Sequence, residues 1–176
     1  MRAVLDACVL YPTLTRGLLL DAAAAGVFTP LWSPRITFEW TNAATRETPA
    51  ALVAAEAAAL AARWPGAEIA LPEGAEDALS LPDPDDTHVL AAAIEGRAEA
   101  IVTFNLRDFP GRTLARHGIQ PWHPDPFLLA ALGEAQAPML AALRTRLDAL
   151  SATDTPRAIL KRARLPRLGK AVAALL

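Results

Sequence analysis

At 176 residues the chain is long enough for one domain with a hydrophobic core, and its single cysteine, Cys8, excludes an internal disulfide. No apolar run reaches the length of a membrane span, since the segment 18–28 is broken by Asp21 and Gly26. The first six residues are too short and too acidic a stretch for a signal peptide, and no Cys/His spacing suits zinc. We therefore expect a cytoplasmic protein without membrane attachment.

Charge is distributed unevenly along the chain. Residues 1–143 hold 9 Lys/Arg and 17 Asp/Glu, a net charge of −8, whereas residues 144–176 hold 8 and 2, a net charge of +6. An acidic body with a basic tail is predicted. Such a tail can contact nucleic acid, an acidic partner or the body itself.

The first part of the chain predicts strands that alternate with helices. Asp6 ends the first strand, and Ser33 followed by Pro34 is typical of a helix N-terminus. Pro30 weakens the second strand. In chain order we expect a strand at 2–5, a turn at 7–12, a helix at 16–25, a strand at 27–32, a helix at 35–42, a long alanine-rich helix at 49–64 and a short strand at 68–71.

An acidic stretch comes next and carries three carboxylates within four positions, Asp83, Asp85 and Asp86, directly before an apolar helix. Asp83 with Pro84 predicts an N-cap followed by proline at the first helical position. One carboxylate suits a helix N-terminus, but three repel one another. A bound cation would relieve that repulsion, and capping alone explains part of the pattern equally well.

The rest of the chain predicts two more strands, at 100–104 and 119–122, with a loop at 105–111 and a short helix at 112–117 between them. Asp125 with Pro126 predicts the cap of a helix to about residue 134, and further helices are expected at 138–150, from 156 and at 165–176. The fold class is therefore α/β, with a parallel sheet covered by helices on both faces and a helical C-terminal extension. We place the domain at 1–128 and the extension, with its basic tail, at 129–176.

Ligands bind beyond the carboxyl ends of the strands in open parallel sheets. Asp6 and Asp108 follow strands, Asp86 opens a helix near the same edge, and Glu39 is a charge inside an otherwise apolar helix. Four carboxylates from four segments would repel one another unless a hard divalent cation held them. Such a site is suited to hydrolysing phosphodiesters.

These segments together resemble one family, the PIN-domain nucleases, and are most similar to VapC-type toxins of bacterial toxin–antitoxin pairs. The similarity spans roughly residues 1–130, in the expected order, and rests on Leu5-Asp6, Ser33-Pro-Arg-Ile-Thr-Phe-Glu39-Trp40, Asp83-Pro-Asp-Asp86-Thr-His-Val-Leu-Ala-Ala-Ala93 and Val102-Thr-Phe-Asn105-Leu-Arg-Asp108-Phe-Pro110. The resemblance implies a three-layer α/β/α sandwich and an endoribonuclease that uses Mg²⁺ or Mn²⁺. It also implies a homodimer and a cognate antitoxin.

By this resemblance, the catalytic and metal-binding residues are Asp6, Glu39, Asp86 and Asp108. Asp83, Thr103 and Asn105 would surround them, whereas Asp85 is expected on the solvent face. Cys8 departs from the family, which often has Thr or Ser soon after the first Asp, so one polar contact of the site is in question.

Other interpretations remain beside this one. Glu39 can simply pair with Arg35 four residues earlier. An aspartyl phosphatase is disfavoured because the segment after Asp6 lacks a second Asp two residues on, and a non-catalytic RNA- or protein-binding module stays open. Cys8 is read as a small buried side chain rather than a nucleophile, and His88 as a surface or core histidine that points away from Asp86.

The basic tail has three readings: a solvated helix face, an RNA-phosphate contact or a dock for an acidic partner. Its candidate RNA-binding residues are Arg157, Lys161, Arg162 and Arg164.

Overall fold

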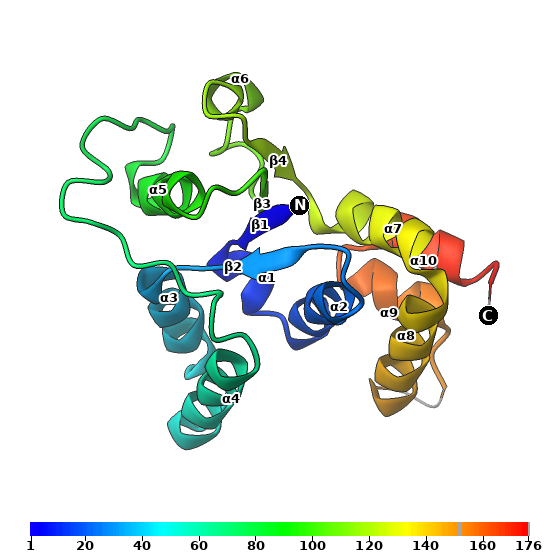
Figure 1. Ribbon diagram of the computed structural model, residues 1–176. Coiled ribbons are helices and arrows are strands. Elements are labelled where there is room, and N and C mark those ends of the chain that lie inside the picture. The colour runs from blue at the N-terminus through cyan, green and yellow to red at the C-terminus, as the bar shows by residue number, and fades with distance from the viewer. Residues whose placement is uncertain (151–152, 176) are drawn as a thin grey trace. The chain divides into compact units, whose positions relative to one another are not determined.

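The computed structural model describes residues 1–150 and 153–175, and the chain divides into two compact units. The first unit comprises Met1–Tyr11 and Thr29–Trp122, and the second comprises Pro12–Phe28 and His123–Leu176 (Figure 1). The division proposed from the sequence, with a domain at 1–128 and an extension at 129–176, stays a prediction.

The first unit contains a four-stranded sheet in which every pairing is parallel. The strands are β1 (Arg2–Leu5), β2 (Thr29–Leu31), β3 (Ala100–Val102) and β4 (Gln120–Trp122), in the order β2-β1-β3-β4. Val4 of β1 lies opposite Leu31 on one side and Ile101 on the other, and all three are fully buried. The α/β fold class is confirmed. The strand expected at 68–71 is reduced to one bridge, between Trp32 and Glu68.

Helices of this unit follow the strands, as predicted. They are α1 (Ala7–Leu10), α3 (Pro34–Ala44), α4 (Ala50–Arg63), α5 (Thr87–Glu95) and α6 (Gly111–Ala115). The Ser33 hydroxyl accepts a hydrogen bond from the Ile36 backbone N–H at 3.2 Å, which confirms the predicted N-cap of α3. The segment read as a turn at 7–12 instead contains the short helix α1.

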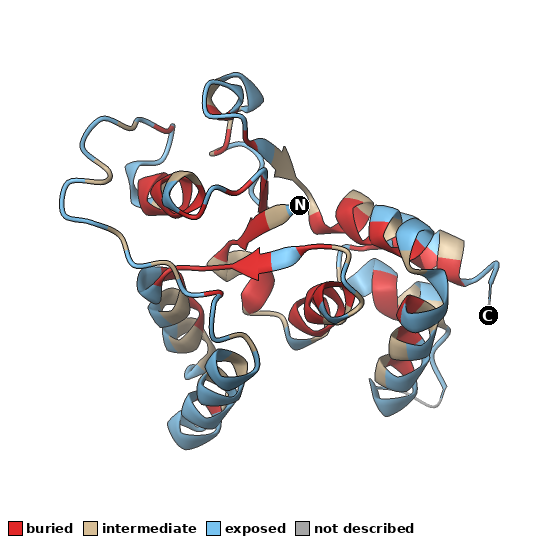
Figure 2. Ribbon diagram, in the orientation of Figure 1, coloured by how far each residue is buried: buried red, intermediate tan, exposed pale blue. Residues whose placement is uncertain are grey.

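Burial differs sharply between α4 and α5. The strands β1 and β3 and most of α5 are buried, whereas Val53 is the one residue of α4 that is buried (Figure 2).

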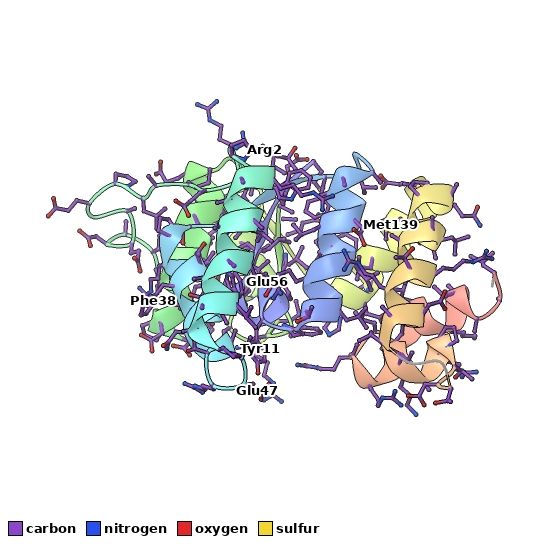
Figure 3. The ribbon with its side chains drawn as sticks, turned by 90° about the horizontal axis from the view of Figure 1, so that it is seen from below. Arg2, Tyr11, Phe38, Glu47, Glu56 and Met139 are labelled. Atoms are coloured by element: carbon purple, nitrogen blue, oxygen red, sulfur yellow. The ribbon has the colours of Figure 1, made fainter. Side chains whose placement is uncertain are left out.

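Seen from below, Phe38 of α3 lies at the outer edge of the unit and is 67% exposed (Figure 3). In the same view Tyr11 and Glu47 lie together, and a hydrogen bond between their side chains raises the pKa of Tyr11.

The acidic stretch forms two elements rather than one helix. Residues Pro84–Asp86 make a 3₁₀ turn, η1, and α5 begins only at Thr87. The Asp83 carboxylate caps η1 by accepting from the Asp85 backbone N–H at 3.0 Å. Gly96 is the C-cap of α5, and a side chain there would meet the Leu31 side chain at 2.9 Å. The glycine thus lets the helix end approach β2 closely.

The second unit is helical. It consists of α2 (Thr13–Ala24), α7 (Pro124–Glu134), α8 (Gln136–Leu150), α9 (Pro156–Arg162) and α10 (Pro166–Val172); Leu176, the last residue of the predicted final helix, lies outside the described residues. Phe28 packs edge-on against Phe127, with ring centroids 5.0 Å apart, and Arg146 pairs with Asp21. None of the helices in the described part of the chain combines the length and apolar character that a bilayer crossing requires.

The predicted capping role of Asp125 is wrong for its own helix. The N-cap of α7 is His123, whose Nδ1 accepts from the Asp125 backbone N–H at 3.1 Å. The buried Asp125 carboxylate instead accepts from the backbone N–H groups of Arg167 at 3.0 Å and Leu168 at 2.9 Å. It therefore satisfies the free N-terminal donors of α10, 42 residues along the chain.

Replacing Asp125 with Ala should lower the free energy of unfolding by about 2 kcal/mol, because one buried and one partly buried N–H group at the start of α10 lose their acceptor. Asp125→Asn, which keeps one acceptor oxygen, should cost less. Urea denaturation monitored by circular dichroism measures both, with the exposed Asp148→Ala of α8 as a control. Equal effects of Asp125→Ala and Asp148→Ala would contradict the capping role.

Candidate metal centre

Asp6 is held at the carboxyl end of β1, where the central strands pair. Its backbone N–H donates to the Val102 carbonyl at 3.1 Å, and its side chain is 6% exposed. The oxygen Oδ2 accepts from the Thr103 hydroxyl at 2.7 Å and from the Cys8 thiol at 3.0 Å. Among residues 1–150 and 153–175, no donor contacts Oδ1, so this oxygen keeps its capacity to bind a ligand.

A short polar chain connects Asp6 with Asp108 in the loop after β3. The Thr103 hydroxyl donates to Asp6 and accepts from the Asn105 backbone N–H at 3.0 Å. The Asn105 side-chain amide in turn donates to the Asp108 carboxylate. Thr103 and Asn105 thus lie where they orient two of the carboxylates predicted from the sequence.

Asp83, Asp86 and Asp108 come close enough to share one ion. One carboxylate oxygen from each lies within 4.8 Å of the others. Burial is the largest cause that raises the pKa of Asp86 to about 7, and the charges of Asp6, Asp83, Asp108 and Glu39 supply the rest of the rise. Four carboxylates therefore act on Asp86: Asp83 from the same acidic stretch, and three others from separate segments of the chain. Asp85 is exposed, as predicted.

Glu39 lies in α3, and one of its oxygens faces two nitrogen groups. Arg35 Nε donates to Oε1 at 3.2 Å, and Nε2 of His88 lies 3.0 Å from the same oxygen. Burial is the main cause of the raised pKa of Glu39, which the Arg35 charge opposes. The pairing with Arg35 predicted from the sequence is present, and it coexists with the electrostatic coupling between Glu39 and Asp86.

Two neighbours of the site make contacts that the sequence did not reveal. His88 is a core histidine, one of the two expected alternatives: it is 1% exposed beside Glu39, and burial together with the Arg35 charge lowers its pKa to about 4. Cys8 is not simply a small apolar side chain, since its thiol donates to Oδ2 of Asp6 at 3.0 Å. Burial and the Asp6 charge raise the pKa of the Cys8 thiol, so it remains a protonated donor. Helical spacing could not reveal the His88 contact, because Glu39 belongs to another helix.

The chemistry of this cluster suits a hard divalent cation. Its acceptors are carboxylate oxygens, the ligands that Mg²⁺ and Mn²⁺ prefer. The raised pKa of Asp86 reflects its burial first and its repulsion by these charges second, and a bound cation would favour the ionised carboxylate against both. In the described part of the chain, Asp83, Asp86 and Asp108 are the side chains whose oxygens lie close enough to hold such an ion together, and Asp6 and Glu39 lie near enough to act on Asp86 electrostatically.

The fold and the acidic cluster together place the protein among α/β proteins that carry a carboxylate site beyond the carboxyl ends of a parallel sheet. The family model for the PIN domain matches residues 2–107, and the chain belongs to the PIN-domain family. "Putative ribonuclease VapC50" of Mycobacterium tuberculosis is 42% identical over 76 residues, which cover 43% of this chain and 45% of that protein. The match thus spans less than half the length of this curated relative. No solved structure matches the chain significantly.

Replacing Asp86 with Asn should stabilise the metal-free protein at high pH. The folded protein holds the pKa of Asp86 at about 7, above the roughly 4 expected when unfolded, so this carboxyl destabilises the fold increasingly as pH rises from about 4 to 7. Allowing for solvent screening of a partly exposed group, we expect a gain of about 1–2 kcal/mol at pH 8 and roughly half that at pH 5.5.

Chemical denaturation in EDTA at the two pH values measures this gain, with the exposed Asp85→Asn as the matched control. A gain for Asp86→Asn that is the same at both pH values would show that carboxylate repulsion is not its cause.

Proposed function

We propose that this protein is a divalent-metal-dependent endoribonuclease that hydrolyses RNA phosphodiesters. The observation that carries the proposal is the acidic cluster: carboxylate oxygens of Asp83, Asp86 and Asp108 lie within 4.8 Å of one another, and the charges of Asp6 and Glu39 also act on Asp86. Membership of the PIN-domain family and the similarity to a protein named as a ribonuclease support the choice of reaction.

Asp6, Asp86 and Asp108 would hold the cation, Mg²⁺ or Mn²⁺, and Glu39 would bind it or orient the attacking water. When bound, such an ion lowers the pKa of its water and stabilises negative charge on the phosphate. Thr103 and Asn105 would keep Asp6 and Asp108 in position through their hydrogen bonds, and Asp83 would add negative charge at the mouth of the site. No side chain needs to act as a covalent nucleophile.

The basic tail is proposed as an RNA-phosphate contact. Arg157, Lys161, Arg162 and Arg164 are all exposed on α9 and the turn that follows it. Arg162 pairs with Asp154, which reduces its free charge. Arg157 and Lys161 lie one helical turn apart and line one surface hollow with Thr155 and Pro166. These two cations are the best candidates for phosphate contacts.

We further propose that the protein is the toxin of a toxin–antitoxin pair. It would be cytoplasmic and homodimeric, and a cognate antitoxin would inhibit it. This proposal rests on the likeness to VapC-type proteins. The alternative function is an RNA- or protein-binding module without catalysis, and the cleavage experiment separates the two.

Cleavage of a mixed pool of single-stranded and structured RNA should require Mg²⁺ or Mn²⁺ and stop in EDTA. Asp6→Asn should lower the rate by about 10²–10³-fold or more, because the site loses a charged ligand. The matched control is Asp85→Asn, the same chemical change on an exposed carboxylate in the acidic stretch, which should cleave nearly as fast as the wild type.

Mg²⁺ should also raise the melting temperature of the wild type and of Asp85→Asn, but not that of Asp86→Asn, since an ion that binds the native state stabilises it. Cation-dependent stabilisation without cleavage of any RNA would favour the binding module. Cleavage that survives EDTA and Asp6→Asn would exclude the proposed mechanism.

Arg157→Gln combined with Lys161→Gln should weaken RNA binding and reduce its salt dependence. Each lost phosphate contact on a single strand lowers the slope of log K against log salt by about 0.7. The measurement is fluorescence anisotropy with labelled RNA on the Asp6→Asn background, which prevents cleavage. Arg144→Gln, an exposed cation of α8, is the control, and an unchanged slope in the double variant would assign the tail to solvent or to a protein partner.

A further inference from the structure

Glu39 presents its two carboxylate oxygens to different surroundings. Oε1 lies 3.2 Å from Arg35 Nε and 3.0 Å from His88 Nε2. Within the described ranges, 1–150 and 153–175, no donor contacts Oε2. The carboxylate is therefore held on one side and open on the other.

We propose that His88 is a positioning residue, which holds Oε1 of Glu39 through Nε2–H so that Oε2 is presented to the cation or its water. This inference rests on the proposed nuclease function and adds to it a residue that acts through Glu39. Arg35 would hold the same oxygen from the solvent side.

Burial of His88 is the first argument. The side chain is 1% exposed, although α5 could have carried an apolar residue at this inward-facing position. Neither ring nitrogen makes an aligned hydrogen bond to the described residues, although Nε2 lies 3.0 Å from Oε1 of Glu39. A buried polar group without a hydrogen-bond partner is unfavourable. A small rotation of the Glu39 carboxylate would align Oε1 with Nε2–H of His88 and complete the hydrogen bond between them.

Arg35 provides the second argument, because it fixes the other side of the same oxygen. Its Nη2 donates to the Asp85 carbonyl at 3.2 Å, so the guanidinium bridges the start of α3 and the acidic turn η1. Glu39 is thereby tied to the segment that carries Asp86. Arg35 donates to Oε1 and Nε2 of His88 approaches the same oxygen to 3.0 Å, so completion of the His88 contact would restrict the rotation of the carboxylate.

The two donors differ in exposure and charge. Arg35 is an exposed cation that water and salt can screen, whereas His88 is buried and brings no charge when neutral. A neutral imidazole donates a hydrogen bond without competing electrostatically with a bound cation. Such outer contacts orient metal ligands, and their loss typically lowers activity or metal affinity about 10–100-fold.

The proposal is tested with four variants: His88→Leu, His88→Gln, Glu39→Gln, and Glu39→Gln combined with His88→Leu. His88→Leu should lower kcat about 10–100-fold with RNA and Mg²⁺. His88→Gln, whose amide can donate from nearly the same place as Nε2, should recover most of that loss. His117→Leu, a change at an exposed histidine, is the matched control and should leave the rate unchanged.

A double-mutant cycle identifies the route of the effect. Because His88 acts through Glu39, the double variant should be no slower than Glu39→Gln alone. Effects that multiply, a Gln variant as slow as the Leu variant, or full activity of His88→Leu would each overturn the proposal.

A readout that needs neither RNA nor metal is the tautomer of His88, read from its ¹⁵N ring shifts at pH 7.5. We expect the proton on Nε2 in the wild type and a perturbed Nε2 shift in Glu39→Gln. A proton on Nδ1 would overturn the proposal, even if His88→Leu proved unfolded. A wild type that shows the Nε2 tautomer but cleaves no RNA would instead contradict the nuclease function and leave the His88–Glu39 contact standing.

Discussion

Electrostatic repulsion among carboxylates at the edge of a parallel sheet is the constraint on which this site depends. Asp86 is surrounded by Asp6, Asp83, Asp108 and Glu39, and its pKa rises to about 7 as a result of burial and of their charge. Left alone, such a cluster would drive its loops apart. The acidic turn η1, the loop after β3 and the start of α3 must therefore be held by other interactions, or by a cation, for the cluster to persist.

The interactions that hold these segments are mostly hydrogen bonds from neutral donors, some within one turn and some between distant parts of the chain. Pairing of β1 with β3 fixes Asp6 beside Thr103, and the Thr103 hydroxyl and Cys8 thiol both donate to one Asp6 oxygen. Asn105 restrains Asp108, Asp83 caps its own turn, and Arg35 links Glu39 to the Asp85 carbonyl. Each donor engages one oxygen of its carboxylate. In Asp6 and Glu39 this leaves the second oxygen without a described donor, an arrangement that favours capture of a positive ligand.

Much of the fold could be predicted from the sequence because its signals are local. Short apolar runs indicate buried strands, and Ser-Pro, Asp-Pro and Thr-Pro pairs indicate helix starts. Ser33, Asp83 and Thr155 do cap the elements that they precede. Asp125-Pro126 is the exception: His123 caps α7, and the Asp125 carboxylate satisfies donors of α10 instead. A local pattern cannot distinguish the two roles, since the competing donors lie 42 residues away.

The sequence by itself determined the order and type of the elements, the parallel α/β class and the set of acidic residues near Asp86. Periodicity, helix caps and acidic motifs each depend on only a few adjacent positions, so the sequence alone reveals them. Only the tertiary structure decided which side chains complete the site. His88 reaches Glu39 across two helices, Cys8 donates where a hydroxyl is usual, and Arg35 bridges two segments. These contacts depend on how α3, α5 and the strand ends pack together, and that packing is set by burial over the whole unit rather than within any one stretch of chain.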